Sequence, residues 1–260
     1  MFRIFKYSFF DLMRSRWSYI YCLFYFVVSA GLFYMSSDIS KAIVSLMNIV
    51  LILIPLISTV FGIMYYFNSR EFIELLLAQP IKRTSIFFGQ YLGLATSLSL
   101  SFVIGLLIPF AFSGLFASEE APNFFILILA GISLTFIFSA IAFLIALKNE
   151  NKIKGFSIAI IVWLVLAVLY DGLFLLSLLY FEEYPLDKFA LGATIFNPID
   201  LSRILIMLKL DISALMGYTG ALFNKFFGTA MGIGISLISL SLWILLPVTA
   251  FLRISKTKDF

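Results

Sequence analysis

The residues that could carry chemistry are few in this sequence and lie far apart. The chain has no histidine and one cysteine, Cys22, which falls inside an apolar stretch and is expected to pack there. Histidine is the commonest general base and transition-metal ligand, so its absence weighs against a metalloenzyme and a serine–histidine hydrolase. Thioethers bind Cu(I), but Met207, Met216 and Met231 form no M-x-M or M-x-x-M motif and are expected to fill apolar space. We predict no catalytic residue and no metal ligand in this chain.

Asp171 is the only acidic residue well inside an apolar stretch. An ionisable side chain in hydrocarbon is costly and is therefore a functional hypothesis. At 1.5 Å per helical residue it lies about 24 Å from Gly155, nearer the outer membrane face. We favour a structural carboxylate that is hydrogen-bonded to a neighbouring helix or sits near Gly172 at the interface. A hinge contact and a proton or metal relay are the alternatives.

A second candidate is residues 68–85, which read NSREFIELLLAQPIKRTS. Ser69 is expected to cap a helix that carries Glu71 and Glu74 in its first turns, and Pro80 is expected to stop it. The segment falls between two apolar stretches and would lie at a membrane surface. It is either an ordinary amphipathic connector or a knob that docks into a groove on a soluble partner.

A third candidate is residues 182–225, the longest region outside the apolar stretches. Asn197 is expected to cap a helix, with Pro198 at its first position and Asp200 in its first turn. Short apolar helices in this region are expected to dip back into the membrane as a lid.

The composition indicates that membrane-spanning helices position these residues. Hydrophobic residues make up 62% of the chain and charged residues 12%, which is too apolar for a soluble domain. Basic residues lie in short runs and form no stripe, so nucleic-acid binding is not expected. A transmembrane helix needs about 20 apolar residues, and the apolar stretches lack the alternation of a barrel. We predict an all-α, polytopic membrane protein with one transmembrane domain over 1–260 and six spans: 17–35, 43–67, 86–114, 124–147, 156–181 and 226–252.

Orientation follows from Lys and Arg, which are enriched in cytoplasmic loops. Thirteen of the 18 fall on one side of the predicted membrane, in the N-terminal segment, the second-to-third and fourth-to-fifth connections, and the C-terminus. This predicts that both termini are cytoplasmic. Residues 1–16 are expected to form an interfacial helix, either as a membrane-surface anchor or as a helix that also touches a cytoplasmic partner.

The run EFIELLLAQPIKR resembles the coupling segment of type-2 ABC exporter permeases, and FFDLMRSRW resembles their entry helix. This resemblance implies that 68–85 seats on a separate ATPase. The chain has no phosphate-binding GxxxxGK[ST] motif, so ATP and magnesium would be bound by that partner. The residues implied to couple to the ATPase are Glu71, Glu74, Leu75, Leu76, Gln79, Pro80 and Arg83.

The outer segments NPIDLSRI and LMGYTGA resemble the permeases of the transporter that matures nitrous-oxide reductase, the Nos-type permeases. The resemblance implies a homodimer in a bacterial inner membrane, two copies of a cytoplasmic ATPase, and a periplasmic copper-handling protein that would hold the copper. It further implies an outer lid and partner contact formed by Asn197, Pro198, Asp200, Arg203, Met216 and Gly217.

Three other interpretations remain open. One is an ABC exporter permease for another cargo, such as a lipid, a drug or a gliding-machinery component. Another is a secondary transporter, which would need polar groups near the middle of several spans. The last is a membrane scaffold that transports nothing.

Overall fold

The computed structural model describes residues 1–36, 39–113, 118, 121–181, 187–209, 226 and 229–257. Helices account for nearly all of these residues, and no strand occurs among them, which confirms the predicted all-α class. In chain order the elements are α1 (Phe2–Met13), α2 (Arg16–Met35), α3 (Ile39–Asn68), α4 (Arg70–Leu77), α5 (Arg83–Phe112), α6 (Ala121–Lys148), α7 (Lys152–Leu164), the π-helix η2 (Val165–Leu169), α8 (Tyr170–Tyr180), α9 (Asp187–Phe196), α10 (Pro198–Lys209) and α12 (Ala230–Thr257).

Six of the described helices are long and apolar enough to cross a bilayer, as predicted. Five of these spans are α2, α3, α5, α6 and α12, and the remaining one is formed by α7, η2 and most of α8 in succession. The long ones have 28 to 30 residues, more than the roughly 20 needed to cross hydrocarbon, so they extend beyond it or tilt. The chain is a multi-pass membrane protein.

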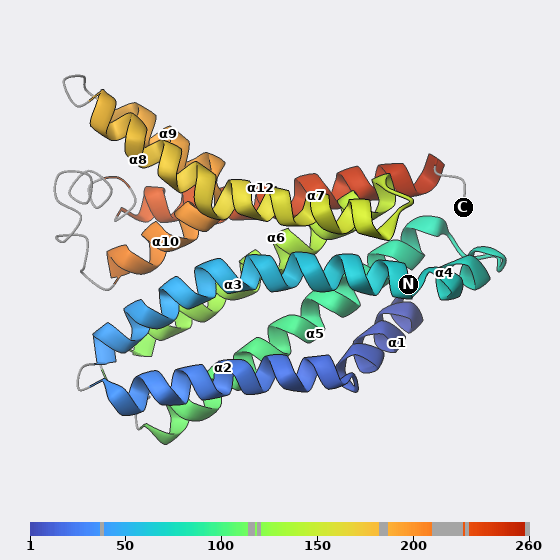
Figure 1. Cartoon of the computed structure of the whole chain (residues 1–260), viewed down its shortest axis with the longest axis horizontal. Helices are drawn as coiled ribbons and strands as arrows, with labels where there is room; N and C mark the ends of the chain where they lie inside the picture. The colour runs from blue at the N-terminus through green and yellow to red at the C-terminus, as the bar shows by residue number, and fades with distance from the viewer. Residues whose placement is uncertain are drawn as a thin grey trace.

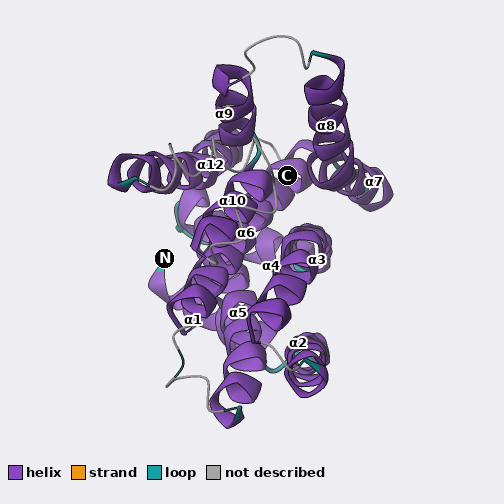
Figure 2. Cartoon of the chain, turned by 90° about the vertical axis from the view of Figure 1, so that its left-hand side faces the viewer, coloured by secondary structure: helices purple, strands orange, loops and turns teal. Residues whose placement is uncertain are grey.

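Helices α5 and α6 organise the bundle. Helices α1 and α2 pack against α5, whereas α3, α10 and α12 pack against α6 (Figure 1). Helix α7 packs mainly on α3. Seen along the bundle, α10 lies over α6, and α8 and α9 project away from the packed helices (Figure 2). The centre is filled by aromatic rings such as Phe102, Phe138 and Phe143, all fully buried.

Glycine positions on α5 let the N-terminal helices approach closely. A Cβ at Gly93 would lie 2.5 Å from Cβ of Ser8 in α1, and a Cβ at Gly105 would lie 2.7 Å from the carbonyl oxygen of Cys22 in α2. Side chains at these two glycines would make contacts too short to be tolerated without movement of a helix. The backbone of α2 at Cys22 therefore lies directly against the third span.

The basic connections gather at one end of the bundle. This basic end comprises α1, α4, the 148–152 connection and the C-terminal part of α12, whereas α9 and α10 lie at the opposite end (Figure 1). Lys152 Nζ donates a hydrogen bond to Asn68 Oδ1 over 2.9 Å, which joins two of these connections directly. The charge distribution predicts that the basic end is cytoplasmic.

The predicted interfacial helix over 1–16 is present as α1, but it is more than a surface anchor. Ile4 and Ser8 are buried against α5. Ile4 packs on Gly89, and Ser8 packs on Gly93. Phe2, on another part of the helix, is 73% exposed and is free to enter a membrane interface.

Candidate functional site

The helix predicted after the second span is α4, and it presents one face outward. Ile73 is 1% exposed and anchors the helix to the bundle, with Leu76 and Leu77 partly buried beside it. Glu71, Glu74, Leu75, Gln79 and Pro80 are exposed at the basic end. Leu75 is a large apolar side chain with 67% of its surface open, flanked by carboxylates. Such an apolar residue within a charged rim is typical of a protein-binding surface.

The start of α4 differs from the prediction in one detail. Ser69 occupies the cap position, but its hydroxyl does not cap the helix. Its carbonyl instead accepts the Ile73 N–H over 2.9 Å, and its own N–H donates to the Tyr65 carbonyl over 2.9 Å. The turn between α3 and α4 is therefore continuous in backbone hydrogen bonding. The Ser69 backbone, at φ −91° and ψ 7°, is not in the extended conformation from which a capping side chain reaches the first-turn N–H groups. Glu74 pairs with Arg70 at 3.1 Å, an exposed pair that contributes little to stability.

Helix α4 also contacts α1. The rings of Tyr7 and Phe72 stack with centroids 4.8 Å apart. Since Phe72 precedes the buried Ile73, the helix is held by α1 on one side and by α3 and α5 at its ends. A force on α4 would therefore reach three other helices. Arg83 begins α5 beyond the turn at Pro80 and is exposed.

At the opposite end, α9 and α10 form a sharp bend, here called the elbow (residues 187–209). The two helices meet at 113°, which fits either a broken span or a re-entrant pair. The predicted helix start at Asn197 and Pro198 is confirmed, because α10 begins at Pro198 and the Ile199 N–H donates to Asn197 Oδ1 over 3.1 Å. Helix α9 was not predicted, although its run DKFALGATIF is apolar enough for a helix.

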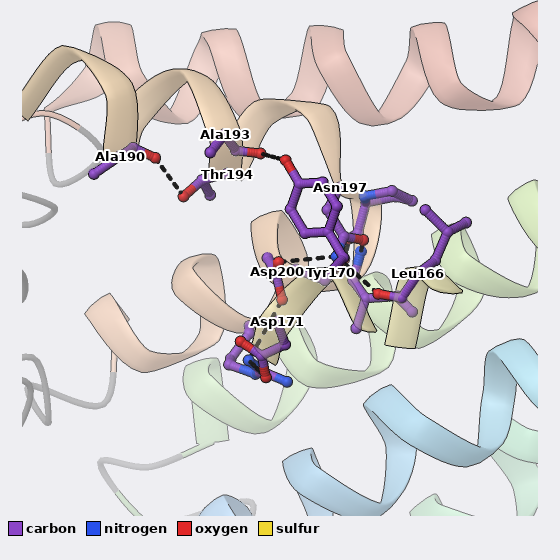
Figure 3. Close-up of polar contacts among 12 residues, drawn as sticks. Leu166, Tyr170, Asp171, Ala190, Ala193, Thr194, Asn197 and Asp200 are labelled. Carbon is purple, nitrogen blue, oxygen red and sulfur yellow. Dashed lines mark hydrogen bonds and ion pairs between the residues drawn. The ribbon is translucent and has the colours of Figure 1, made fainter. Parts of the chain in front are cut away.

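Asn197 links the elbow to the fifth span. Its Nδ2 donates to the Leu166 carbonyl over 2.9 Å and to Asp200 Oδ2 over 2.8 Å (Figure 3). Leu166 belongs to the π-helix η2, where the Tyr170 N–H bonds to the Val165 carbonyl five residues back. Single π turns inside α-helices recur at functional sites, because they shift the ladder of carbonyl partners. Here the shifted segment faces an amide donor from another helix.

Asp171 is paired as a structural carboxylate. Arg203 Nη1 donates to Asp171 Oδ2 over 2.7 Å and lies 3.4 Å from Asp200 Oδ1. One guanidinium therefore sits between carboxylates from α8 and α10. The side chain of Asp200 is 10% exposed and those of Arg203 and Asp171 are 23% and 30% exposed, so the pair is only partly screened by solvent.

Further contacts hold α9 in place. The Tyr170 hydroxyl donates to the Ala193 carbonyl over 2.6 Å (Figure 3). The Ile195 carbonyl accepts from both Ser239 Oγ and Trp243 Nε1 of α12, each over 3.3 Å. The elbow is therefore bonded to the fifth span on one side and to the last span on the other.

The structure brings Asn197, Asp200, Arg203 and Asp171 together, although the sequence suggested different roles for them. Asn197 is 0% exposed and Asp200 7% exposed within the single chain, so they face inward, and partner contact through them stays a prediction. Met216 and Gly217 lie outside the described residues. In the described part of the chain, no three Cys or carboxylate side chains gather closely enough to hold a metal ion.

Comparison with known proteins gives one informative match. No family model matches the chain. The chain is 26% identical over 257 residues to "Probable ABC transporter permease protein NosY" of Stutzerimonas stutzeri, covering 92% of this chain and 86% of that protein. Along almost its entire length, this chain resembles a NosY-type ABC transporter permease.

Proposed function

We propose that this chain is the permease subunit of an ABC transporter, driven by two copies of a separate cytoplasmic ATPase. The observation that carries the proposal is the exposed face of α4, a short helix anchored by Ile73 that turns Glu71, Glu74 and Leu75 outward at the basic end. A rigid surface helix continuous with a span can transmit motion from a docked partner. The similarity to an ABC permease over 92% of the chain supports this assignment.

The route for such motion runs along α3. This helix has 30 residues and is about 45 Å long, with α4 joined to its C-terminal end. It packs against η2, α7 and α10, which carry or adjoin the elbow contacts. Trp163 Nε1 of α7 also donates to the Ile52 carbonyl of α3 over 3.1 Å. Movement of α4 would therefore be transmitted to the π-helix and the elbow through the contacts of α3 with η2 and α10.

The more specific proposal concerns what the transporter serves. We propose a role in maturation of nitrous-oxide reductase, with a homodimeric permease in a bacterial inner membrane, as the resemblance to Nos-type permeases implies. The similarity to a protein named NosY supports this proposal. In this role the elbow would communicate with a periplasmic copper-handling partner, which would hold the copper, while ATP and magnesium stay on the ATPase. Asn197, Pro198, Asp200 and Arg203 would shape the surface that this partner meets.

A permease for another cargo is the second candidate. A secondary transporter has less support, because Asp171, the one acidic residue deep in a predicted span, is engaged by Arg203. A gene for a periplasmic copper protein beside this one would favour the nitrous-oxide-reductase role over another cargo.

Copurification from the native host tests the proposal. The tagged chain should retain an ATPase, and the double variant Glu71→Lys with Glu74→Lys should lose it. Glu150→Lys is the matched control, since Glu150 is exposed at the same end but lies outside α4. An ATPase that never copurifies, or that stays with the double variant, contradicts the coupling role. Metal analysis of each copurified subunit should find copper on the periplasmic partner and none on this chain.

A further inference from the structure

A cleft beside α1 is not used by the coupling proposal. Its larger recess, about 700 Å³, lies where α1, α2 and the basic end of α3 meet. A smaller recess of about 440 Å³ follows the outer face of α1. Asp11 and Arg14 line both recesses, so the two adjoin at these side chains.

The larger recess is mainly apolar. Trp17 and Phe61 form an edge-to-face pair with ring centroids 6.2 Å apart, and Val60 and Met64 continue the wall along α3. Trp17 is 57% exposed although it begins a membrane span. The wall therefore offers aromatic and aliphatic surface at the height where a span leaves the hydrocarbon.

The smaller recess is basic. Arg3, Lys6 and Arg14 line it with one acid, Asp11, and all four side chains are exposed. Three cations against one carboxylate leave a local positive charge. Arg and Lys at a membrane surface attract anionic headgroups, and the arginine fork also matches the geometry of a phosphate.

We infer that the cleft binds one anionic phospholipid of the leaflet at the basic end. The phosphate would lie against Arg3, Lys6 and Arg14, and an acyl chain would lie along Trp17 and Phe61. A free phosphate would use only the basic recess, and a neutral lipid would use only the apolar wall. A positive recess that adjoins an apolar one at Asp11 and Arg14 matches a ligand that carries both parts.

The location places this lipid beside the proposed coupling helix α4. Tyr7, which lines the basic recess, stacks on Phe72 of α4. A lipid held against α1 would therefore rest one side chain away from the docking helix. Binding itself does not depend on an ATPase and is tested on this chain alone.

The experiment uses the full chain in phosphatidylcholine nanodiscs, with Trp163→Phe and Trp243→Phe so that Trp17 is the sole tryptophan. Brominated phosphatidylglycerol or brominated phosphatidylcholine is added at equal mole fraction, and quenching of Trp17 fluorescence is measured. Each basic side chain near an anionic surface contributes about a fivefold preference. We expect at least about fivefold higher apparent affinity for brominated phosphatidylglycerol.

Two triple variants decide the origin of that preference. Arg3→Gln with Lys6→Gln and Arg14→Gln should abolish it, whereas Lys148→Gln with Lys154→Gln and Lys256→Gln removes equal charge elsewhere at the basic end and should retain it. Equal quenching by both lipids in the parent chain overturns the site, and so does equal loss in both triples. Inorganic phosphate that changes Trp17 emission in pure phosphatidylcholine would show an anion site and overturn the lipid assignment. An unchanged Trp17 emission maximum in the α1 triple before lipid addition establishes that the α1–α2 region remains folded.

Discussion

Arg203 of α10 and Asp171 of α8 meet at 2.7 Å, and this contact joins the outer part of the fifth span to the elbow. Asp171→Asn should lower the free energy of unfolding by about 1–3 kcal/mol, since it leaves a partly buried guanidinium with Asp200 as its remaining carboxylate in the described part of the chain. Thermal unfolding of the purified chain in detergent measures the loss.

A double-mutant cycle checks that the loss arises from this pair. Asp171→Asn combined with Arg203→Gln should cost less than the sum of the single changes, because the second change removes the stranded charge. Full additivity would contradict a direct interaction. The ATPase should copurify with Asp171→Asn at the parent level, since α4 lies at the other end of the bundle.

Asn197 performs two tasks that substitution can separate. Asn197→Ala should destabilise the chain by about 1–2 kcal/mol, because it removes the helix cap and the donor to the Leu166 carbonyl. Asn197→Ser keeps an acceptor for the Ile199 N–H but is too short to bond with Leu166, and it should recover only part of the loss. Thermal melts of the three chains provide the comparison. Equal stability of the serine variant and the parent would show that the Leu166 bond contributes nothing.

The two faces of α4 should respond differently to truncation. Ile73→Ala should cost about 2–4 kcal/mol through loss of buried contacts, whereas Leu75→Ala should change stability by less than about 0.5 kcal/mol. We expect Leu75→Ala to weaken copurification of the ATPase even so. Stability is read from thermal melts and binding from the copurified amount. A Leu75 variant that binds like the parent would place the docking contacts elsewhere.

Gly93 tests the seating of α1. Gly93→Ala places a methyl group 2.5 Å from Cβ of Ser8 and should cost about 1–3 kcal/mol by pushing α1 outward. Limited proteolysis should then release the N-terminal segment faster. Gly31→Ala in α2 is the control, because nothing lies within 4 Å of its added carbon and the change should be neutral or slightly stabilising. Equal protease resistance of the two variants would show that α1 does not need this close approach.

Much of the architecture followed from the sequence because hydrophobic length alone specifies a span. The predicted start at residue 17 and end at 35 differ from α2 by at most one residue. The helix α4 and the start of α10 were predictable for a similar reason, since a proline and local polar residues mark their boundaries. Local signals of this kind act within a few residues and can be read without knowing the fold.

The polar network could not be read in the same way. The family resemblance implied that Arg203 belongs to an outer lid, but it did not reveal the bond from Arg203 to a carboxylate 32 residues earlier in the chain. The run VLAVL has no composition that would predict a π-helix. The Leu166 carbonyl in this run accepts a hydrogen bond from Asn197 of another helix, and the sequence does not predict that pairing. Partners distant in sequence are set by packing, which hydropathy and capping rules do not describe. Ser69 does not cap α4 with its side chain, because its backbone conformation follows from the end of α3 and is not extended.

The seating of Ser8 on Gly93 also sets an order of events during synthesis. Gly93 is made about 85 residues after Ser8, so at roughly 5–20 residues per second the ribosome takes about 4–17 s to supply it. Throughout that interval α5 is not yet available to α1, so α1 would remain at the membrane surface. Its exposed phenylalanines and basic side chains can bind a membrane surface during this time. The N-terminal helix would pack into the bundle only after the third span has been inserted.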